Sequence, residues 1–182
     1  MTSFLNPAEI DRRLDQAVQQ VTRAWFPANS AQLRQIQSGL RTGIYKTNVD
    51  ELIASIRSDF SLLIYCLREL YQQAKEEGDL HSSNLSAEQL LRWGGLARLR
   101  PILLVDEKSI SPYALKGADH LQAGRLVEAM TSAATAELLA NGQGIDSDYA
   151  YFAALMRQLG SILIAWNYPL EYEDAVNSLK TV

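Results

Sequence analysis

The sequence contains one cysteine, few glycines and prolines, and no excess of basic residues. The lone thiol, Cys66, cannot form a disulfide within the chain, which favours a reducing, cytoplasmic compartment. Ten glycines and five prolines in 182 residues are too few for a loop-rich β-sandwich, a collagen-like repeat or a disordered tail. The net charge of −4 lacks the basic surplus that is typical of nucleic-acid-binding proteins, so we expect no nucleic-acid partner.

Long apolar runs are also missing. The longest, residues 160–166, is far shorter than the roughly 20 residues that cross a bilayer. The N-terminus has no basic segment followed by an apolar run, as a secretory signal would. No Cys/His cluster has zinc spacing, and no Gly-rich loop matches a phosphate-binding pattern. We therefore expect a soluble cytoplasmic protein with no membrane contact, no metal and no cofactor.

What the sequence does contain favours helices, since 27 leucines and 22 alanines make up more than a quarter of it. No segment alternates polar and apolar residues for long enough to predict a strand. Apolar residues instead recur every three or four positions, which predicts an all-α, compact bundle of eight to ten helices. These helices are expected at about residues 7–24, 33–40, 48–56, 58–77, 86–94, 96–103, 118–140, 147–166 and from 169 onward.

Capping residues and breakers set the expected ends of these helices. Asn48 with Glu51 and Ser86 with Gln89 are cap pairs at helix starts. Pro101 is expected to kink or restart the segment 96–103, and residues 106–108 are interpreted as a connection. We expect one main domain over residues 47–182, preceded by an N-terminal helical extension over 1–46.

Few side chains suggest chemistry. His81 lies in a polar turn and His120 at the start of a long helix, and neither has a second ligand at metal spacing, so both are interpreted as surface or structural residues. Cys66 is expected to be a buried, inert thiol. Residues 86–100 allow a helix-turn-helix, with Arg92, Arg98 and Arg100 contacting phosphates, which leaves a DNA-binding regulator as an alternative.

Three segments taken together resemble a known family. Residues 47–62 place a helix before an acidic cap and a second helix, residues 85–100 carry a glycine-leucine and an arginine-leucine-arginine element, and residues 149–172 form a helix that ends at a proline. In this order and spacing they resemble the HDOD family, the HD-related output domains of bacterial signalling proteins. The resemblance spans about residues 26–182 and implies an HD-like helical domain that is shortened or truncated at its C-terminus.

The resemblance also implies which residues would occupy the metal site of catalytic HD relatives. It places Arg157 at the position of the metal-binding histidine, Gln158 at that of the aspartate, and Val127 or Glu128 at that of the isolated histidine. Because a guanidinium donates only and repels a cation, this site would hold no metal. The resemblance therefore implies a non-catalytic signalling or scaffold module with a protein partner in trans, from two-component or cyclic di-GMP signalling.

The remaining expectations concern the vacated cleft and the rival function. Glu128 and Arg157 are expected to face each other there, beside Gln158, either as a structural ion pair or as a partner-binding site. An HD-type phosphohydrolase with its ligands elsewhere in the chain stays open as the enzymatic alternative. The sequence leaves the oligomeric state undetermined.

Overall fold

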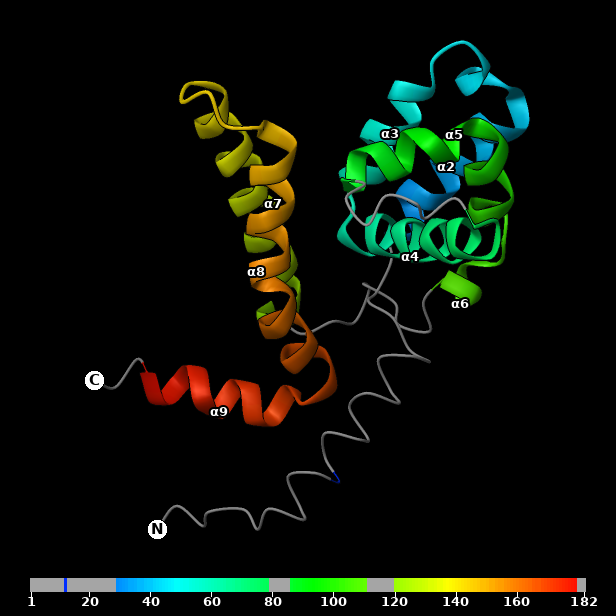
Figure 1. Ribbon diagram of the computed structural model, residues 1–182. Helices are drawn as coiled ribbons and strands as arrows, with labels where there is room; N and C mark the ends of the chain where they lie inside the picture. Colours follow the sequence, from blue (N-terminus) through cyan, green and yellow to red (C-terminus); the bar gives the residue numbers. More distant parts are fainter. Residues whose placement is uncertain (1–11, 13–28, 79–85, 111–119, 180–182) are drawn as a thin grey trace.

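The computed structural model describes residues 12, 29–78, 86–110 and 120–179, which form helices and contain no strand. The expected all-α fold is thus confirmed, and Figure 1 shows its arrangement. The helix predicted at residues 7–24 falls outside the described residues, apart from residue 12. Along the described chain the elements are α2 (Ser30–Thr42), the 3-10 helix η1 (Ile44–Lys46), α3 (Val49–Arg57), α4 (Phe60–Glu76), α5 (Ala87–Leu103), α6 (Glu107–Ile110), α7 (His120–Asn141), α8 (Ser147–Asn167) and α9 (Pro169–Leu179).

Side-chain caps begin several helices where the sequence predicts them. The Asn48 side chain accepts from the backbone N–H of Glu51 at the start of α3. Ser86 and Gln89 form a reciprocal capping box at the start of α5. The backbone N of Gln89 lies 3.2 Å from the Ser86 hydroxyl oxygen, and the backbone N of Ser86 lies 2.9 Å from the Gln89 amide oxygen. Each cap satisfies N–H groups that the first turn of a helix leaves unpaired.

Helices α2 to α5 surround one apolar core. Leu33, Ile36 and Leu40 of α2 are at most 3% exposed and belong to the same cluster as the apolar residues of α3, α4 and α5. The expected boundary after residue 46 is therefore wrong for the described part of the chain, because it would cut through this core. The other helices contribute Leu52, Ile56, Leu62, Leu63, Leu70, Leu91, Leu99 and Leu103.

The break in α5 lies at Gly95, between the two helices that the sequence predicts at 86–94 and 96–103. Gly95 has φ +50°, a conformation that L side chains rarely adopt, and it divides α5 into two helical pieces. The residues around Pro101 keep helical φ/ψ, so α5 continues through the proline and the expected restart there is wrong. The neighbouring Gly94 has a different role, since a Cβ at this position would lie 2.6 Å from a methyl carbon of Leu70 on α4. Helices α4 and α5 therefore pack closely at this point.

Residues 106–110 also differ from the prediction. The expected connection at 106–108 instead begins the short helix α6, and Ile110 at its end is 2% exposed. Burial of this one apolar side chain attaches the turn to the core.

Helices α7 and α8 form an antiparallel hairpin beside the α2–α6 helices, and α9 turns away from the end of α8 (Figure 1). Ala129 and Ala133 of α7 are fully buried, and their small side chains allow the two helices to approach closely. The Arg125 side chain of α7 hydrogen-bonds the Tyr172 hydroxyl and thereby attaches α9. No helix in the described part of the chain is long and apolar enough to span a membrane.

Candidate functional site

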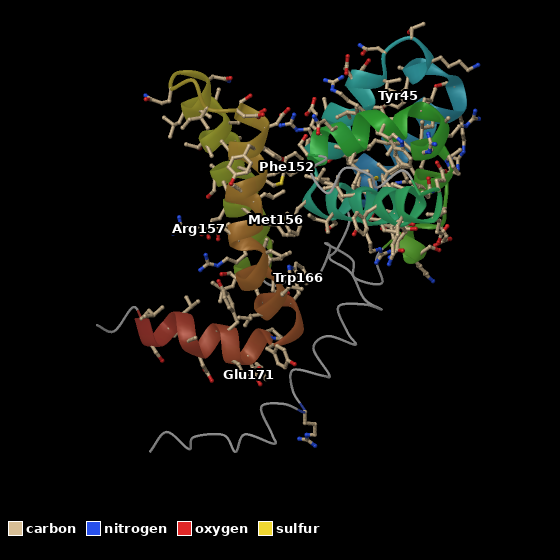
Figure 2. All side chains as sticks on the ribbon, in the orientation of Figure 1. Tyr45, Phe152, Met156, Arg157, Trp166 and Glu171 are labelled. Atoms are coloured by element: carbon tan, nitrogen blue, oxygen red, sulfur yellow. The ribbon has the colours of Figure 1, made fainter. Side chains whose placement is uncertain are left out.

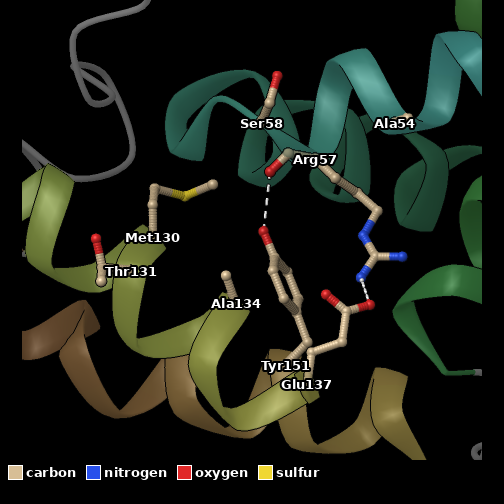
Figure 3. Close-up of a pocket in the computed structure, with 8 residues that line it drawn as sticks. All are labelled: Ala54, Arg57, Ser58, Met130, Thr131, Ala134, Glu137 and Tyr151. Atoms are coloured by element: carbon tan, nitrogen blue, oxygen red, sulfur yellow. Dashed lines mark hydrogen bonds and ion pairs between the residues drawn. The ribbon is translucent and has the colours of Figure 1, made fainter. Parts of the chain in front are cut away.

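Arg57, the last residue of α3, lies where the hairpin meets the other helices. Its guanidinium pairs with three carboxylates: Glu88 of α5 at 2.9 Å, Glu137 of α7 at 2.7 Å and Asp148 of α8 at 3.2 Å. Figure 3 shows the guanidinium directed at Glu137. One side chain thus joins three helices that lie far apart in the sequence. We call these four residues the Arg57 junction.

Tyr151 of α8 adds a second attachment to Arg57. Its hydroxyl donates to the backbone oxygen of Arg57 at 2.9 Å, and its ring centre lies 4.5 Å from the guanidinium carbon (Figure 3). Tyr151 is 4% exposed, so both contacts form away from most of the solvent. A cation against an aromatic face is attractive, and partial burial strengthens that attraction.

The electrostatics of the junction favour a fully charged arginine. Burial lowers the pKa of Arg57, but the nearby carboxylates of Glu137, Glu88 and Asp148 outweigh it and raise the pKa. The pKa of Asp148 is also raised, chiefly by burial and by the negative charge of Glu88, although Arg57 opposes both. Arg92 pairs with the other oxygen of Glu88 at 2.7 Å and supplies a second cation.

Two adjoining clefts run along α7 beside the junction. The larger, of about 560 Å³, is open to solvent and is lined by the end of α3 and by Met130, Thr131, Ala134 and Glu137 of α7 together with Tyr151. The smaller, of about 300 Å³, shares Ser58, Met130 and Thr131 with it. Because the charged groups of the junction already pair with one another, this region is better explained as a structural contact between helices than as a reaction centre.

Asp59 lies in the wall of the smaller cleft and is the cap of α4. Its two oxygens accept backbone N–H groups of Leu62 at 2.8 Å and Asn29 at 3.0 Å. Burial raises the pKa of Asp59 even though these hydrogen bonds act in the opposite direction. The carboxylate thus ties the start of α2 to the start of α4, which accounts for its burial.

The structure does not bring Glu128 and Arg157 together. Glu128 is exposed and pairs with Arg125 one turn earlier on α7, at 2.7 Å. Arg157 is exposed and lies on the side of the hairpin away from α2–α6 (Figure 2), while Gln158 is half-buried. The expected ion pair across a buried cleft is therefore wrong. These residues are on the outer surfaces of two helices that pack together through their other faces.

The other candidate residues are placed as follows. His81 falls outside the described residues, and His120 begins α7. Cys66 is fully buried and burial raises the pKa of its thiol, as expected for an inert side chain. Within the described residues, no group of three or more His, Cys, Asp or Glu side chains is placed to hold a metal ion.

The segment considered for DNA binding engages two of its arginines within the chain. Arg92 pairs with Glu88 and with Asp50 at 2.5 Å, and Arg98 pairs with Glu77 at 2.8 Å while lying 4.0 Å from the ring centre of Trp93. A phosphate would have to displace these carboxylates. The geometry therefore gives the helix-turn-helix alternative no support.

The hairpin carries a surface feature that the sequence reasoning missed. Large apolar side chains are exposed along α7, α8 and the turn between them; they are Val127, Leu138, Leu139, Ile145, Tyr149, Met156 and Ile164. The four at or near the turn, Leu138, Leu139, Ile145 and Tyr149, are each more than half exposed. Their spacing was visible in the sequence, but periodicity alone does not say which apolar stripe of a helix faces the core.

Comparisons with protein-family models, with curated proteins and with solved structures find no match to this chain.

Proposed function

We propose that this chain is a non-catalytic signalling or scaffold module of the HDOD type, which acts by binding another protein. The observation that carries the proposal is the exposed apolar surface of the α7–α8 hairpin. Large apolar side chains that gather exposed on one element are common at protein interaction sites. The resemblance to HDOD domains agrees with it, and it implies a partner from two-component or cyclic di-GMP signalling.

The Arg57 junction supports the proposal in a second way. An interaction surface needs a rigid base, because ordering loose side chains or helices on binding costs affinity. Arg57 and Tyr151 fix the hairpin to the α2–α5 core through four contacts, namely the ion pairs of Arg57 with Glu137 and Asp148, a hydrogen bond and a cation–ring contact. The exposed face is thereby presented on a supported element.

The test is site-specific photo-crosslinking in the native cell. A photoreactive amino acid replaces Leu138 or Tyr149 on the hairpin, and Ile44 of η1, which is 58% exposed, serves as the matched control. We expect discrete crosslinked proteins from the two hairpin positions and none from the control.

Two results would overturn the proposal. One is the absence of any crosslinked protein at both hairpin positions. The other is metal-dependent hydrolysis of a phosphomonoester or a cyclic dinucleotide by the purified chain, since that activity would support the HD-type phosphohydrolase instead.

A further inference from the structure

One face of α8 carries exposed residues that are apolar or small. They recur at spacings of four, three, four and four residues, and they are Tyr149, Ala153, Met156, Gly160 and Ile164. At about 100° per residue these positions share one side of the helix, and the buried Tyr151 and Ile162 lie on the opposite side. We call these five residues the exposed stripe.

The exposed stripe has almost no charge. Between Tyr149 and Ile164 the sequence contains one charged residue, Arg157, which helical spacing places at the edge of the stripe and which is exposed there. The nearest acidic side chains have other roles, since Asp148 pairs with Arg57 on another side of α8 and Asp146 caps α8. Charge therefore does not select what covers the stripe, and the spacing and size of its side chains have to be considered instead.

Large and small residues alternate along the exposed stripe in the same order from either end. Tyr149 and Ile164 lie equally far from a midpoint between Met156 and Arg157, and Ala153 and Gly160 also lie equally far from it. If two copies of α8 pack antiparallel about this midpoint, large residues face large ones and small residues face small ones. A two-fold contact requires a surface that complements itself in this way, whereas a contact with a different protein does not.

Gly160 and Ala153 are the positions where two such helices can approach closely. Glycine disfavours a helix interior relative to alanine. Gly160 has no positive φ, and a Cβ there would meet nothing within 4 Å, so the fold of the single chain does not account for this glycine. In the antiparallel pair Gly160 of each copy faces Ala153 of the other, and the two backbones can come together at both places.

The area of the exposed stripe agrees with a weak dimer. Tyr149 is 70%, Ile164 49% and Met156 39% exposed. Together with the rest of the stripe and the half-buried Leu163 beside it, they offer on the order of 500 Å² per copy, or about 1,000 Å² for a pair. Interfaces of this size are typical of transient complexes, so we expect a dissociation constant on the order of 10–100 µM.

We propose that the exposed stripe of α8 packs antiparallel against the same stripe of a second copy of this chain. Ala153 of each copy faces Gly160 of the other, Tyr149 faces Ile164, and the two Met156 side chains meet near the two-fold axis. The inference goes beyond the proposed function, because it adds self-association through α8 and leaves Leu138 of the α7–α8 turn for a different protein.

Sedimentation equilibrium of the full chain at about 1–200 µM tests for the dimer. We expect a reversible monomer–dimer equilibrium for the wild type. Because the two Arg157 side chains approach each other at the edge of the contact, raised salt should not weaken the dimer. A wild type that remains a monomer over this range would overturn the proposal.

Variants of the chain locate the contact. Gly160→Leu fills the place that the second backbone needs without an internal clash, so we expect at least about tenfold weaker dimerisation with an unchanged or raised Tm. Met156→Glu should weaken the dimer as strongly, because it brings two carboxylates together near the axis. Ile44→Glu is the matched control, since Ile44 of η1 is 58% exposed and lies outside the stripe. A dimer that resists both Gly160→Leu and Met156→Glu forms through another surface and refutes the inference.

Disulfide trapping tests the antiparallel register. Chains with Ala153→Cys and with Gly160→Cys are oxidised mildly, each alone and as a mixture; the buried Cys66 is present in all of them. The mixture should form a disulfide-linked dimer. Either variant alone should not, because equal positions are then offset by about 10 Å along the helix axis, which is beyond the reach of a disulfide. Strong trapping of Ala153→Cys alone would show a different arrangement and contradict the proposal.

Crosslinking from Leu138 in the cell separates this inference from the proposed function. A monomeric wild type that still crosslinks to a different protein from Leu138 overturns the dimer and supports the proposed function. A dimer in sedimentation with no crosslinks from Leu138 supports the inference and counts against the proposed function. Crosslinks from Tyr149 should contain the second copy of the chain, and a product that lacks it would contradict the dimer.

Discussion

Replacing Arg57 by alanine tests whether the junction holds the hairpin to the core. The substitution removes one cation that contacts Glu88, Glu137 and Asp148 and leaves their charges close together. It also removes the contact with the Tyr151 ring, while the hydrogen bond from Tyr151 to the backbone oxygen of residue 57 can persist. We therefore expect a loss of stability and not a complete loss of fold.

The magnitude follows from how far these side chains are buried. Breaking a buried ion pair costs about 3–5 kcal/mol, whereas an exposed pair contributes about 1 kcal/mol or less. The side chains of Arg57 and Glu88 are 18% and 12% exposed, and those of Glu137 and Asp148 are 31% and 30% exposed. Glu88 also keeps its pair with Arg92. We expect Arg57→Ala to lower the free energy of unfolding by about 3 kcal/mol, near the lower limit for buried pairs.

Urea unfolding followed by far-UV circular dichroism measures this loss. Arg34→Ala is the matched control, because Arg34 is exposed on α2 and its substitution should change stability by no more than about 0.5 kcal/mol. Arg57→Lys should recover only part of the loss, since an ammonium keeps the charge but not the planar fork that reaches several carboxylates. If Arg57→Ala and Arg34→Ala cost the same, the junction does not stabilise the fold and our reasoning is refuted.

Three further predictions concern packing, the thiol and pH. Gly94→Ala should destabilise the chain by roughly 1–3 kcal/mol in urea unfolding, because its Cβ would press on Leu70. Gly160→Ala should be neutral or stabilising, because a Cβ at Gly160 meets nothing. If Gly160→Ala destabilised the chain more than Gly94→Ala, the packing described would be contradicted. Cys66 should react with a thiol reagent only as the chain unfolds, and rapid labelling of the native protein would show that it is accessible. Burial raises the pKa of Asp59 in the folded chain. Between the ordinary pKa and this raised pKa, the folded chain holds a proton that the unfolded chain has released. The free energy of unfolding therefore falls as pH rises through this window. The difference in the free energy of unfolding between wild type and Asp59→Asn should therefore shrink as pH rises through this window. A difference that grows there would be inconsistent with a raised pKa.

Local signals in the sequence predicted most helix starts. The Asn48 and Ser86 caps stand where expected, because a cap depends on residues only two or three positions away. The same local reasoning predicted the break in α5 between the helices expected at 86–94 and 96–103, and Gly95 with its positive φ lies there. It was wrong about Pro101 as a restart, because a proline removes only one backbone donor and the helix continues past it.

The Arg57 junction could not be predicted from the sequence. Its ion pairs join residues 31, 80 and 91 positions apart, so no spacing rule connects them. Arg57 also looks ordinary in the sequence, as a basic residue in the last turn of a helix. The predicted pair of Glu128 and Arg157 failed for a related reason. The prediction assumed a cleft that the resemblance to HDOD domains implied, whereas both residues are exposed to solvent on the hairpin.

The two faces of α8 make stability and binding separable properties. Asp148 and Tyr151 face the Arg57 junction, while Tyr149 and Ala153, each within two residues of one of them, are exposed on the other side of α8. A helical period of about 3.6 residues is what directs such close neighbours to different sides. A partner bound to the exposed side of α8 therefore leaves the contacts of Arg57 intact, and the loss of Arg57 leaves these exposed side chains unchanged in the folded state. Arg57→Ala should then lower stability with little effect on crosslinking from Tyr149, whereas Met156→Glu on the exposed side should reduce that crosslinking with little effect on stability. If one substitution impaired both properties equally, the two faces would be coupled through α8, and the exposed stripe would have to be regarded as part of the core that Arg57 completes.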